Sequence, residues 1–263
     1  MEEPLSAKEA LAFSHHLADQ ARSLTLRYFR TSFDIARKTD ESIVTTVDQK
    51  VESELRRLIR ERFPDHGIIG EEYGRISGTS SWVLDPIDGT TSLVLGNPLF
   101  GTLIGLLHAD LAFVGLIDIP VMGERWAGDG KRTVFFNGTR SGPAAVAGCK
   151  TLDQARLYIE LPDFLRTGQG EKLYSFIRQT AASHSSCDCY AYGLLASGYC
   201  DLVIEDDLEP YDYLPIVPIV LGAGGCMTDW EGKSLGLNSG GRVVAAATQP
   251  LLYEAISALK SFC

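Results

Sequence analysis

Residues 82–91 read Trp82-Val83-Leu84-Asp85-Pro86-Ile87-Asp88-Gly89-Thr90-Thr91, an apolar run that passes directly into carboxylates, proline and glycine. Upstream, Ile68-Ile69 leads in the same way into Gly70-Glu71-Glu72. We interpret both apolar runs as buried strands. If the strands are adjacent, three or four carboxylates lie within a few ångströms of one another, which costs free energy unless cations lie between them.

The residue types in these two stretches favour a metal ion beside a phosphate group. All the candidate ligands are oxygens with no Cys or His nearby, which suits a hard cation, Mg²⁺ before Mn²⁺ or Ca²⁺. Pro86 stiffens the turn, and the Ile87 carbonyl is expected to point the same way as the aspartates. Gly89-Thr90-Thr91-Ser92 offers small residues and backbone N–H groups that could open a helix and bind an anion, most often phosphate.

Each motif also has a plain structural interpretation. Asp-Pro-x-Asp-Gly on its own is common turn chemistry, and Glu71-Glu72 on its own is more often a solvated strand end. Together, at the ends of two neighbouring strands, they favour a cation site.

Composition excludes several classes of protein. The 263-residue chain is 45% hydrophobic and 22% charged, the balance of a folded globular protein, and its net charge of −10 argues against a nucleic-acid binder. The uncharged stretch from Gly89 to Leu107 is broken by glycines and a proline, so no membrane span is expected. Met1-Glu2-Glu3-Pro4 does not resemble a signal peptide. The six cysteines have no zinc-ligand spacing. We therefore expect reduced thiols and a cytoplasmic location.

Hydrophobic periodicity predicts a mixed α and β (α+β) protein, one domain over residues 1–263 with halves of about 1–145 and 146–263. Ser141–Gly148 is the candidate seam between the halves. Helices are predicted at Ser6–Phe29 (capped by Ser6 and Glu9), Asp48–Phe63, Glu171–Thr180 and Tyr190–Ser197 and beyond Pro210. Strands are predicted at Leu99–Leu107, Ala112–Ile119, Thr133–Phe136, Leu157–Leu161, Leu202–Ile204, Cys226–Thr228 and Val243–Ala247.

The sequence resembles the inositol monophosphatase family of metal-dependent phosphatases. The resemblance is carried by Gly70-Glu71-Glu72, by residues 82–91, by Tyr211-Asp212 followed by Gly224-Gly225, and by the segment 44–52 (Val44-Thr45-Thr46-Val47-Asp48-Gln49-Lys50-Val51-Glu52). It extends from the first helix to Arg242-Val243-Val244-Ala245-Ala246, nearly the whole chain.

The resemblance implies a layered α/β/α/β/α sandwich and a phosphate monoester hydrolase. Its implied metal ligands, for two or three Mg²⁺ ions with Mn²⁺ as a substitute, are Glu71, Asp85, the Ile87 carbonyl, Asp88 and Asp212. A metal-activated water is then the nucleophile, and Glu71 with the Thr90–Asp48 pair orients it and accepts its proton. Inhibition by Li⁺ and a homodimer are also implied. From the residues alone, Asp48 is equally a helix cap with Thr45, and Asp212 an N-cap of a helix through Val217.

Within the family, several stretches are similar to the histidinol-phosphate phosphatase branch of histidine biosynthesis. They are Tyr28-Phe29-Arg30-Thr31, residues 67–74, Asp188-Cys189-Tyr190 and residues 210–218 with 222–230. The run His184-Ser185-Ser186-Cys187-Asp188 departs from the arginine and paired glycines of that branch. The substrate-binding residues implied are Gly89, Thr90, Cys187, Asp188, Glu205 and Asp212. Asp188 and Glu205 offer carboxylates beyond those that bind metal, although the run Glu205-Asp206-Asp207 is otherwise a plain acidic loop.

Three other functions remain open at this stage. The first is an inositol-1-monophosphatase or another small sugar or nucleotide phosphatase of the same family. The second is a protein that binds metal and phosphate without turnover, which would not need the Thr90–Asp48 pair. The third is a glycosidase with two carboxylates about 5–9 Å apart, which would not need clustered oxygen ligands.

Overall fold

The computed structural model describes residues 5–37, 43–160, 170–185 and 188–260. Its first two long helices begin within two residues of their predicted starts. Ser6 and Glu9 form the predicted capping box of α1, and Thr45 and Asp48 form that of α2. The helices of the described residues are α1 (Ala7–Tyr28), α2 (Thr46–Arg62), α3 (Thr90–Leu95), α5 (Gly170–Ile177), α6 (Tyr190–Ala196), α7 (Pro210–Tyr213), α8 (Val217–Gly222) and α9 (Gln249–Leu259), with a 3₁₀ turn at Leu152–Gln154.

An eight-stranded sheet forms the first half of the described chain, in the order β10-β9-β8-β7-β6-β5-β3-β4. All neighbours are antiparallel except β3 and β5, which are parallel. Its strands are β3 (Gly67–Gly70), β4 (Gly74–Ile76), β5 (Ser80–Asp88), β6 (Gly101–His108), β7 (Leu111–Ile119), β8 (Glu124–Gly128), β9 (Thr133–Asn137) and β10 (Arg140–Ala144).

A five-stranded sheet follows, in the order β12-β11-β13-β15-β14, and a short hairpin pairs β1 with β2. In the larger of these, β11 is parallel to both β12 and β13, and β15 is antiparallel to β13 and β14. The strands are β1 (Ile35–Arg37), β2 (Ile43–Thr45), β11 (Arg156–Ile159), β12 (Ala182–Ser185), β13 (Leu202–Glu205), β14 (Cys226–Asp229) and β15 (Val243–Ala246).

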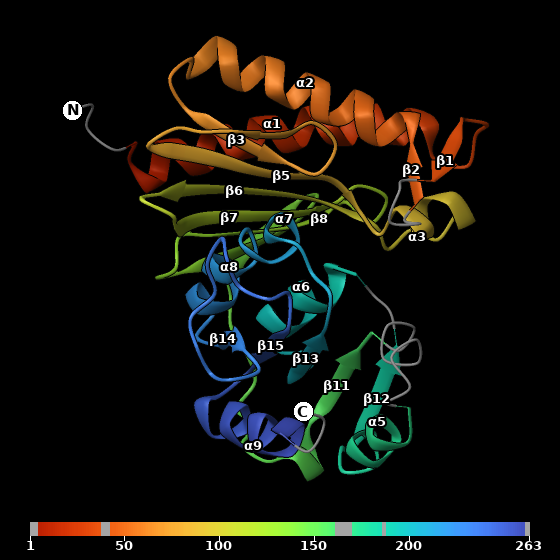
Figure 1. Cartoon of the computed structure of the whole chain (residues 1–263), viewed down its shortest axis with the longest axis vertical. Helices are drawn as coiled ribbons and strands as arrows, with labels where there is room; N and C mark the ends of the chain where they lie inside the picture. The colour runs from red at the N-terminus through yellow and green to blue at the C-terminus, as the bar shows by residue number, and fades with distance from the viewer. Residues whose placement is uncertain (1–4, 38–42, 161–169, 186–187, 261–263) are drawn as a thin grey trace.

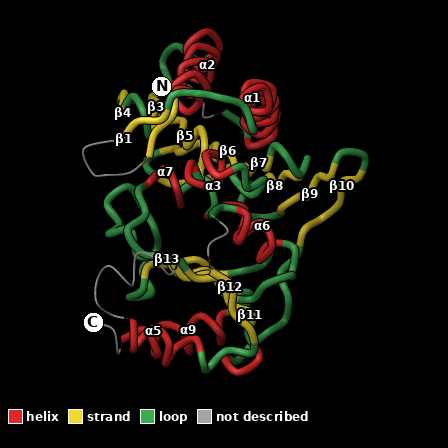
Figure 2. The backbone as a smooth tube through the Cα atoms, turned by 90° about the vertical axis from the view of Figure 1, so that its right-hand side faces the viewer, coloured by secondary structure: helices red, strands yellow, loops and turns green. Residues whose placement is uncertain are grey.

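The elements stack in five layers, which Figure 1 shows from top to bottom and Figure 2 from the side. Helices α1 and α2 cover the outer face of the eight-stranded sheet, and α6, α7 and α8 lie between the two sheets. Helices α5 and α9 cover the outer face of the five-stranded sheet. The predicted mixed α and β class and the α/β/α/β/α sandwich are confirmed.

Successive side chains of β5 point to opposite faces of the sheet, which shows how the sequence produces these layers. Trp82 and Leu84 belong to the core under α1 and α2, whereas Val83 faces the core between the sheets. The middle core joins side chains of both sheets, including Leu103 and Val203. A third core lies under α5 and α9. In the described part of the chain, no helix combines the length and apolar character that a membrane crossing requires.

Several predicted boundaries were wrong. Asp85 and Asp88 do not follow a strand but lie within β5, which continues to Asp88. At the candidate seam, Ser141–Gly148, β10 continues to Ala144, and the next element begins at Leu152. Strands β1, β2, β4, β8, β10 and β12 were not predicted. Most of them are three to five residues long and mainly exposed, so hydrophobic periodicity gives little signal for them.

Candidate functional site

An acidic cluster, defined here as Asp85, Asp88 and Asp212, lies between the eight-stranded sheet and α7. One carboxylate oxygen from each residue lies within 4.8 Å of the other two. The pairing of β5 with β6 is irregular between Asp85, opposite Leu103, and Asp88, opposite Gly101. This bulge re-aims side chains near the end of the strand. It explains how one strand contributes both aspartates.

Burial and mutual repulsion oppose ionisation of the acidic cluster. Burial is the main cause that raises the pKa of Asp85 well above its usual value, with the charges of Glu71 and Asp88 adding to it. Burial and the charge of Asp188 raise the pKa of Asp88 to about 7. The pKa of Asp212 is raised for the same two kinds of reason. A set of crowded carboxylate oxygens fits a hard divalent cation, because positive charge removes this repulsion.

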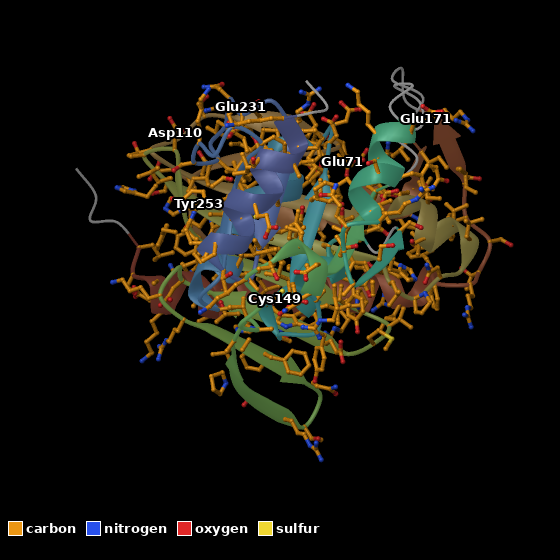
Figure 3. The ribbon with its side chains drawn as sticks, turned by 90° about the horizontal axis from the view of Figure 1, so that it is seen from below. Glu71, Asp110, Cys149, Glu171, Glu231 and Tyr253 are labelled. Atoms are coloured by element: carbon orange, nitrogen blue, oxygen red, sulfur yellow. The ribbon has the colours of Figure 1, made fainter. Side chains whose placement is uncertain are left out.

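Glu71 lies beside the acidic cluster because β3 and β5 are parallel neighbours. Gly70 pairs with Leu84, and the Glu71 N–H donates to the Leu84 carbonyl at 3.3 Å. The Glu71 side chain contributes to the raised pKa of Asp85 by its charge and by a hydrogen bond. Figure 3, which views the molecule from the end that carries α5 and α9, marks Glu71. The expectation that the two acid-ended strands are adjacent is confirmed.

The Ile87 backbone links the acidic cluster to Thr90. Its N–H donates to Asp85 Oδ1 at 2.9 Å, and its carbonyl accepts the Thr90 hydroxyl at 3.1 Å. Gly89, with φ of 81°, forms the N-cap of α3 in the left-handed conformation that glycine adopts without strain. The predicted helix opening at Gly89-Thr90 is therefore confirmed.

Asp48 contacts Thr90 while it caps α2. The Thr90 hydroxyl lies 3.0 Å from Asp48 Oδ1, to which it can donate. Asp48 Oδ2 accepts the Thr45 N–H at 2.9 Å and the Thr45 hydroxyl. Burial raises the pKa of Asp48, although these hydrogen bonds oppose the shift. The cap geometry and the contact with Thr90 therefore occur together in one carboxylate.

Asp212 is not a helix N-cap, which its local sequence offered as the alternative to a metal ligand. Glu209 is the N-cap of α7, and Asp212 is the third residue of that helix, where its Oδ2 accepts the Glu209 N–H at 2.8 Å. The helix ends at Tyr213, and α8 begins separately at Val217. Pro215 lies between them, and it cannot donate a helical hydrogen bond.

Asp188 lies next to the start of α3. The Ser92 hydroxyl donates to Asp188 Oδ2 at 2.9 Å, and the neighbouring Cys189 N–H donates to Asp88. A side chain at Gly89 would overlap the Asp188 carboxylate. Burial raises the pKa of Asp188. Cys187, another predicted site residue, lies outside the described residues.

Glu205 is buried at the end of β13 rather than in a solvated acidic loop. The Tyr192 hydroxyl donates to Glu205 Oε2 at 2.5 Å. Burial raises the pKa of Glu205 well above its usual value, and the charges of Asp88 and Asp188 contribute to the shift. These carboxylates therefore interact electrostatically across the space between the sheets.

Sequence reasoning missed Ser92 and Tyr192 as partners of the two further acids. Ser92 belongs to the small-residue run after Asp88, and Tyr192 follows Asp188 by four residues in the next turn. Ser92 is 96 residues from Asp188 and Tyr192 is 13 residues from Glu205, so no helical spacing in the sequence signals either contact.

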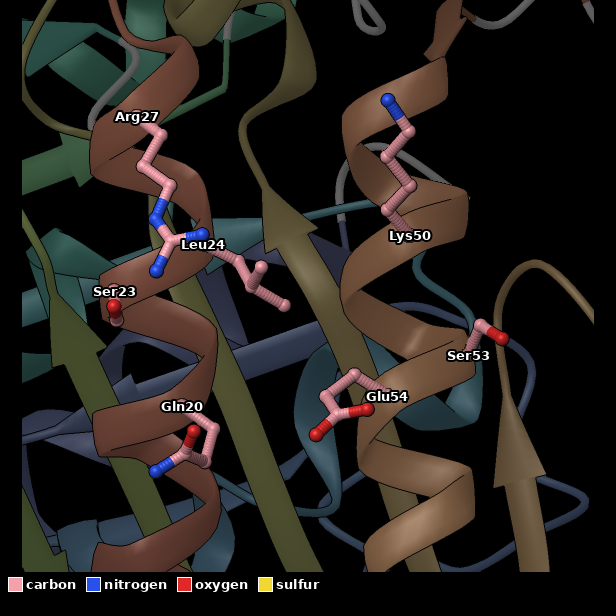
Figure 4. A pocket seen from close by; sticks show the side chains of 7 residues that line it. All are labelled: Gln20, Ser23, Leu24, Arg27, Lys50, Ser53 and Glu54. Carbon is pink, nitrogen blue, oxygen red and sulfur yellow. The ribbon is translucent and has the colours of Figure 1, made fainter.

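A surface hollow of about 320 Å³ lies elsewhere, between α1 and α2 (Figure 4). It is lined by Gln20, Ser23, Leu24, Arg27, Lys50, Ser53 and Glu54. None of the predicted site residues lines it, and its charges are of both signs.

Comparison with known proteins identifies the family of the chain. The model of the inositol monophosphatase family matches residues 6–261. The bifunctional phosphatase IMPL2, chloroplastic, of Arabidopsis thaliana is 42% identical over 95% of this chain and 74% of its own length. A histidinol-phosphatase of Chlorobaculum parvum is 32% identical over 89% of this chain and 91% of its own. A solved inositol monophosphatase of Zymomonas mobilis is 35% identical with a TM-score of 0.86, over 98% of this chain and 100% of that one. The chain therefore belongs to the inositol monophosphatase family of metal-dependent phosphatases.

Proposed function

We propose that this phosphatase is a histidinol-phosphatase, which hydrolyses L-histidinol phosphate to L-histidinol and phosphate with Mg²⁺. The observation that carries the proposal is the pair of carboxylates, Asp188 and Glu205, that lie beside the acidic cluster but outside it. Three curated relatives at 30–32% identity bear the name histidinol-phosphatase. Both lines of support concern the substrate, since the family already defines the reaction class.

The chemistry of the substrate explains why two further acids would be useful. Histidinol phosphate carries an ammonium group and an imidazole, whereas inositol phosphate carries only hydroxyls. A hydrogen bond between an ammonium and a carboxylate is roughly twice as strong as a neutral one. Glu205 is held by Tyr192 and Asp188 by Ser92, so both acceptors are fixed before the substrate binds.

Each group of the site takes a defined role in this proposal. Glu71, the acidic cluster and the Ile87 carbonyl hold Mg²⁺, which when bound makes a water more acidic and supplies charge for the leaving oxygen. Gly89 and Thr90 contact the phosphate. Because the Thr90 hydroxyl donates to Asp48, its oxygen can accept a proton from the attacking water, and Asp48 can take up the Thr90 proton. Glu71 orients the water from the end of β3, the strand that pairs with β5.

Inositol-1-phosphate is the second candidate substrate. It is favoured by the Zymomonas mobilis structure, whose protein is described as an inositol monophosphatase. The homodimer and the cytoplasmic location remain proposals. The name of the Arabidopsis relative specifies the chloroplast for that protein.

Substrate comparison tests the proposal. We expect kcat/KM for L-histidinol phosphate to exceed that for inositol 1-phosphate. Asp188→Asn and Glu205→Gln should each lower kcat/KM for histidinol phosphate by roughly 10- to 160-fold, which corresponds to a loss of about 1.5–3 kcal/mol of transition-state binding. Hydrolysis of p-nitrophenyl phosphate, which lacks the amine, should change little.

Two results would contradict the proposal in different ways. If both substrates lose activity equally in these variants, Asp188 and Glu205 serve the metal site or the fold. If inositol 1-phosphate is the better substrate of the unmodified chain, the assignment to the histidinol-phosphatase branch is wrong. The assignment to the phosphatases would still hold.

A further inference from the structure

A buried ion pair lies on the face of α2 that looks toward the sheet. The Arg56 Nε donates to Glu52 Oε1 at 2.7 Å, and the side chains of Arg56 and Glu52 are 5% and 0% exposed. Asp48, Glu52 and Arg56 follow one another at four-residue spacing, so they share one face of the helix. The same face therefore carries the partner of Thr90 at one end and this ion pair further along.

The ion pair binds the backbone of the turn that carries Glu71. Glu52 Oε2 accepts the Glu72 N–H at 2.7 Å, and Oε1 accepts the Tyr73 N–H at 3.2 Å. A second nitrogen of Arg56 donates to the Gly74 carbonyl. A side chain at Gly70 would overlap the Glu52 carboxylate, so glycine at this position allows the ion pair to approach the turn.

The main chain is consequently fixed by hydrogen bonds both before and after Glu71. Before it, Gly70 pairs with Leu84, and the Glu71 N–H itself donates to Leu84. After it, the next three residues bind the ion pair. The main-chain position of Glu71 relative to Asp85 is thereby fixed by β5 on one side and by α2 on the other.

The burial of this pair needs a reason beyond stability. Removing two charges from water costs several kcal/mol for each ion, and well-packed apolar side chains of the same volume are often as stable. An apolar pair, however, offers no acceptor for the Glu72 and Tyr73 N–H groups and no donor for the Gly74 carbonyl, which the ion pair binds. The ion pair thus does what packing alone cannot do, and it does so at the residues next to Glu71.

We propose that Glu52, paired with Arg56, is a positioning residue that fixes Glu71 for cation binding. This inference rests on the proposed function, in which Glu71 is an Mg²⁺ ligand. Residues that orient metal ligands through hydrogen bonds typically change metal affinity by 10- to 100-fold when they are replaced. In Glu52→Gln, an NH₂ group replaces one acceptor oxygen and faces a backbone N–H, so the turn loses one of its hydrogen bonds.

The test is a calorimetric Mg²⁺ titration of four variants of the whole chain: Glu52→Gln, Glu71→Gln, the double variant, and Glu54→Gln as control. Glu54 forms an exposed ion pair with Arg57 on the same helix and does not contact the turn. We expect Glu52→Gln to weaken Mg²⁺ binding 10- to 100-fold and Glu54→Gln to leave it unchanged. The double variant should bind Mg²⁺ no more weakly than Glu71→Gln, because Glu52 acts through Glu71.

Activity gives a second readout. At saturating Mg²⁺, Glu52→Gln should regain most of its kcat, since the Glu71 carboxylate is still present, whereas Glu71→Gln should not. If Glu52→Gln does not fold, as judged by circular dichroism, Arg56→Lys replaces it. That variant keeps a charge for Glu52 but loses the donor to the Gly74 carbonyl, and we expect a smaller loss of Mg²⁺ affinity.

Three results would overturn the inference. One is unchanged Mg²⁺ affinity in Glu52→Gln, or in Arg56→Lys where that variant replaces it. Another is a double variant whose losses multiply, which would mean that Glu52 acts independently of Glu71. The third is unchanged affinity in Glu71→Gln, which would also remove Glu71 from the proposed ligand set. In the first two cases, weaker Mg²⁺ binding by Glu71→Gln would still support Glu71 as a ligand of the proposed metal site.

Discussion

The Thr90 hydroxyl has one proton and two acceptors within reach, Asp48 Oδ1 at 3.0 Å and the Ile87 carbonyl at 3.1 Å. If it relays a proton from the attacking water, Thr90→Ala should lower kcat by about 10²–10⁴-fold, the range for a positioned proton acceptor. Mg²⁺ affinity should change little, because the side chain contributes no ligand. Thr90→Ser keeps the hydroxyl and is the control. Steady-state kinetics at saturating Mg²⁺ measures the effect, and a trapped phosphorylated side chain would contradict direct attack by water.

Single residues were predictable where local chemistry determines them. Ser6 with Glu9 and Thr45 with Asp48 could be identified as capping boxes, because that bonding depends only on a three-residue spacing. The partners of Asp188 and Glu205 could not be identified. The contact between Ser92 and Asp188 joins residues 96 positions apart, and no local pattern encodes such a distance.

At the scale of elements, the segment between α7 and α8 lies directly on the eight-stranded sheet. Gly105 and Gly115 face each other across β6 and β7, and Pro215 packs on both. A methyl group at Gly115 would overlap the Pro215 carbonyl and lie 2.8 Å from its carbon atom. Since backbone cannot rotate away, Gly115→Ala should destabilise the chain by about 3 kcal/mol.

Denaturant unfolding monitored by circular dichroism checks this value. Gly142→Ala is the matched control, because a methyl group there would meet no atom within 4 Å, and its effect should stay within about 0.5 kcal/mol. Equal effects of the two substitutions would mean that the close approach of Pro215, and with it the placement of Asp212 in α7, is not under tight steric control.

The boundaries of helices and strands were predicted accurately where the hydrophobic periodicity of the sequence is strong. The long amphipathic helices and the buried strands β6 and β7 lie within two residues of their predicted ends. By contrast, β5 was expected to stop before Asp85, because Pro86 and Gly89 are turn residues in isolation. In the sheet, Asp88 pairs with Gly101 beyond the bulge, and the Thr102 hydroxyl donates to the Pro86 carbonyl at 2.9 Å, so contacts with β6 extend the strand to Asp88.

For the whole molecule, the layer order could not be derived from the residues, although family resemblance implied it. Hydrophobic alternation tells which face of a strand is buried, but not which helix covers it. Val83 and Leu103 of one sheet share a core with Val203 of the other, although Val203 lies 120 and 100 positions further along the chain. The acidic cluster depends on this packing, since Asp85 and Asp88 come from β5 and Asp212 from α7.

Because the acidic cluster joins distant parts of the chain, its ionisation should affect global stability. In the metal-free chain the pKa of Asp88 is raised from its usual value of 3.8 to about 7, and those of Asp85 and Asp212 are raised too. Between about pH 4 and pH 7 the folded state therefore holds protons that the unfolded state has lost. Stability contributed by these groups is present at low pH and is lost as the pH rises through 7.

In the proposed site Mg²⁺ should reverse this loss, because a cation held there would bind the deprotonated carboxylates and would have to displace protons at low pH. We expect Mg²⁺ to raise the melting temperature more at about pH 8 than at about pH 5.5, with a gain of ~2.7 kcal/mol at a concentration of 100 Kd. Differential scanning calorimetry with and without Mg²⁺ measures the melting temperature and the gain in stability at each pH, and NaCl in the Mg²⁺-free samples matches the ionic strength. Asp212→Asn, which removes one charge from the cluster, should lose less stability with rising pH and gain less from Mg²⁺. An equal gain at the two pH values would mean that the cation binds elsewhere than at these carboxylates.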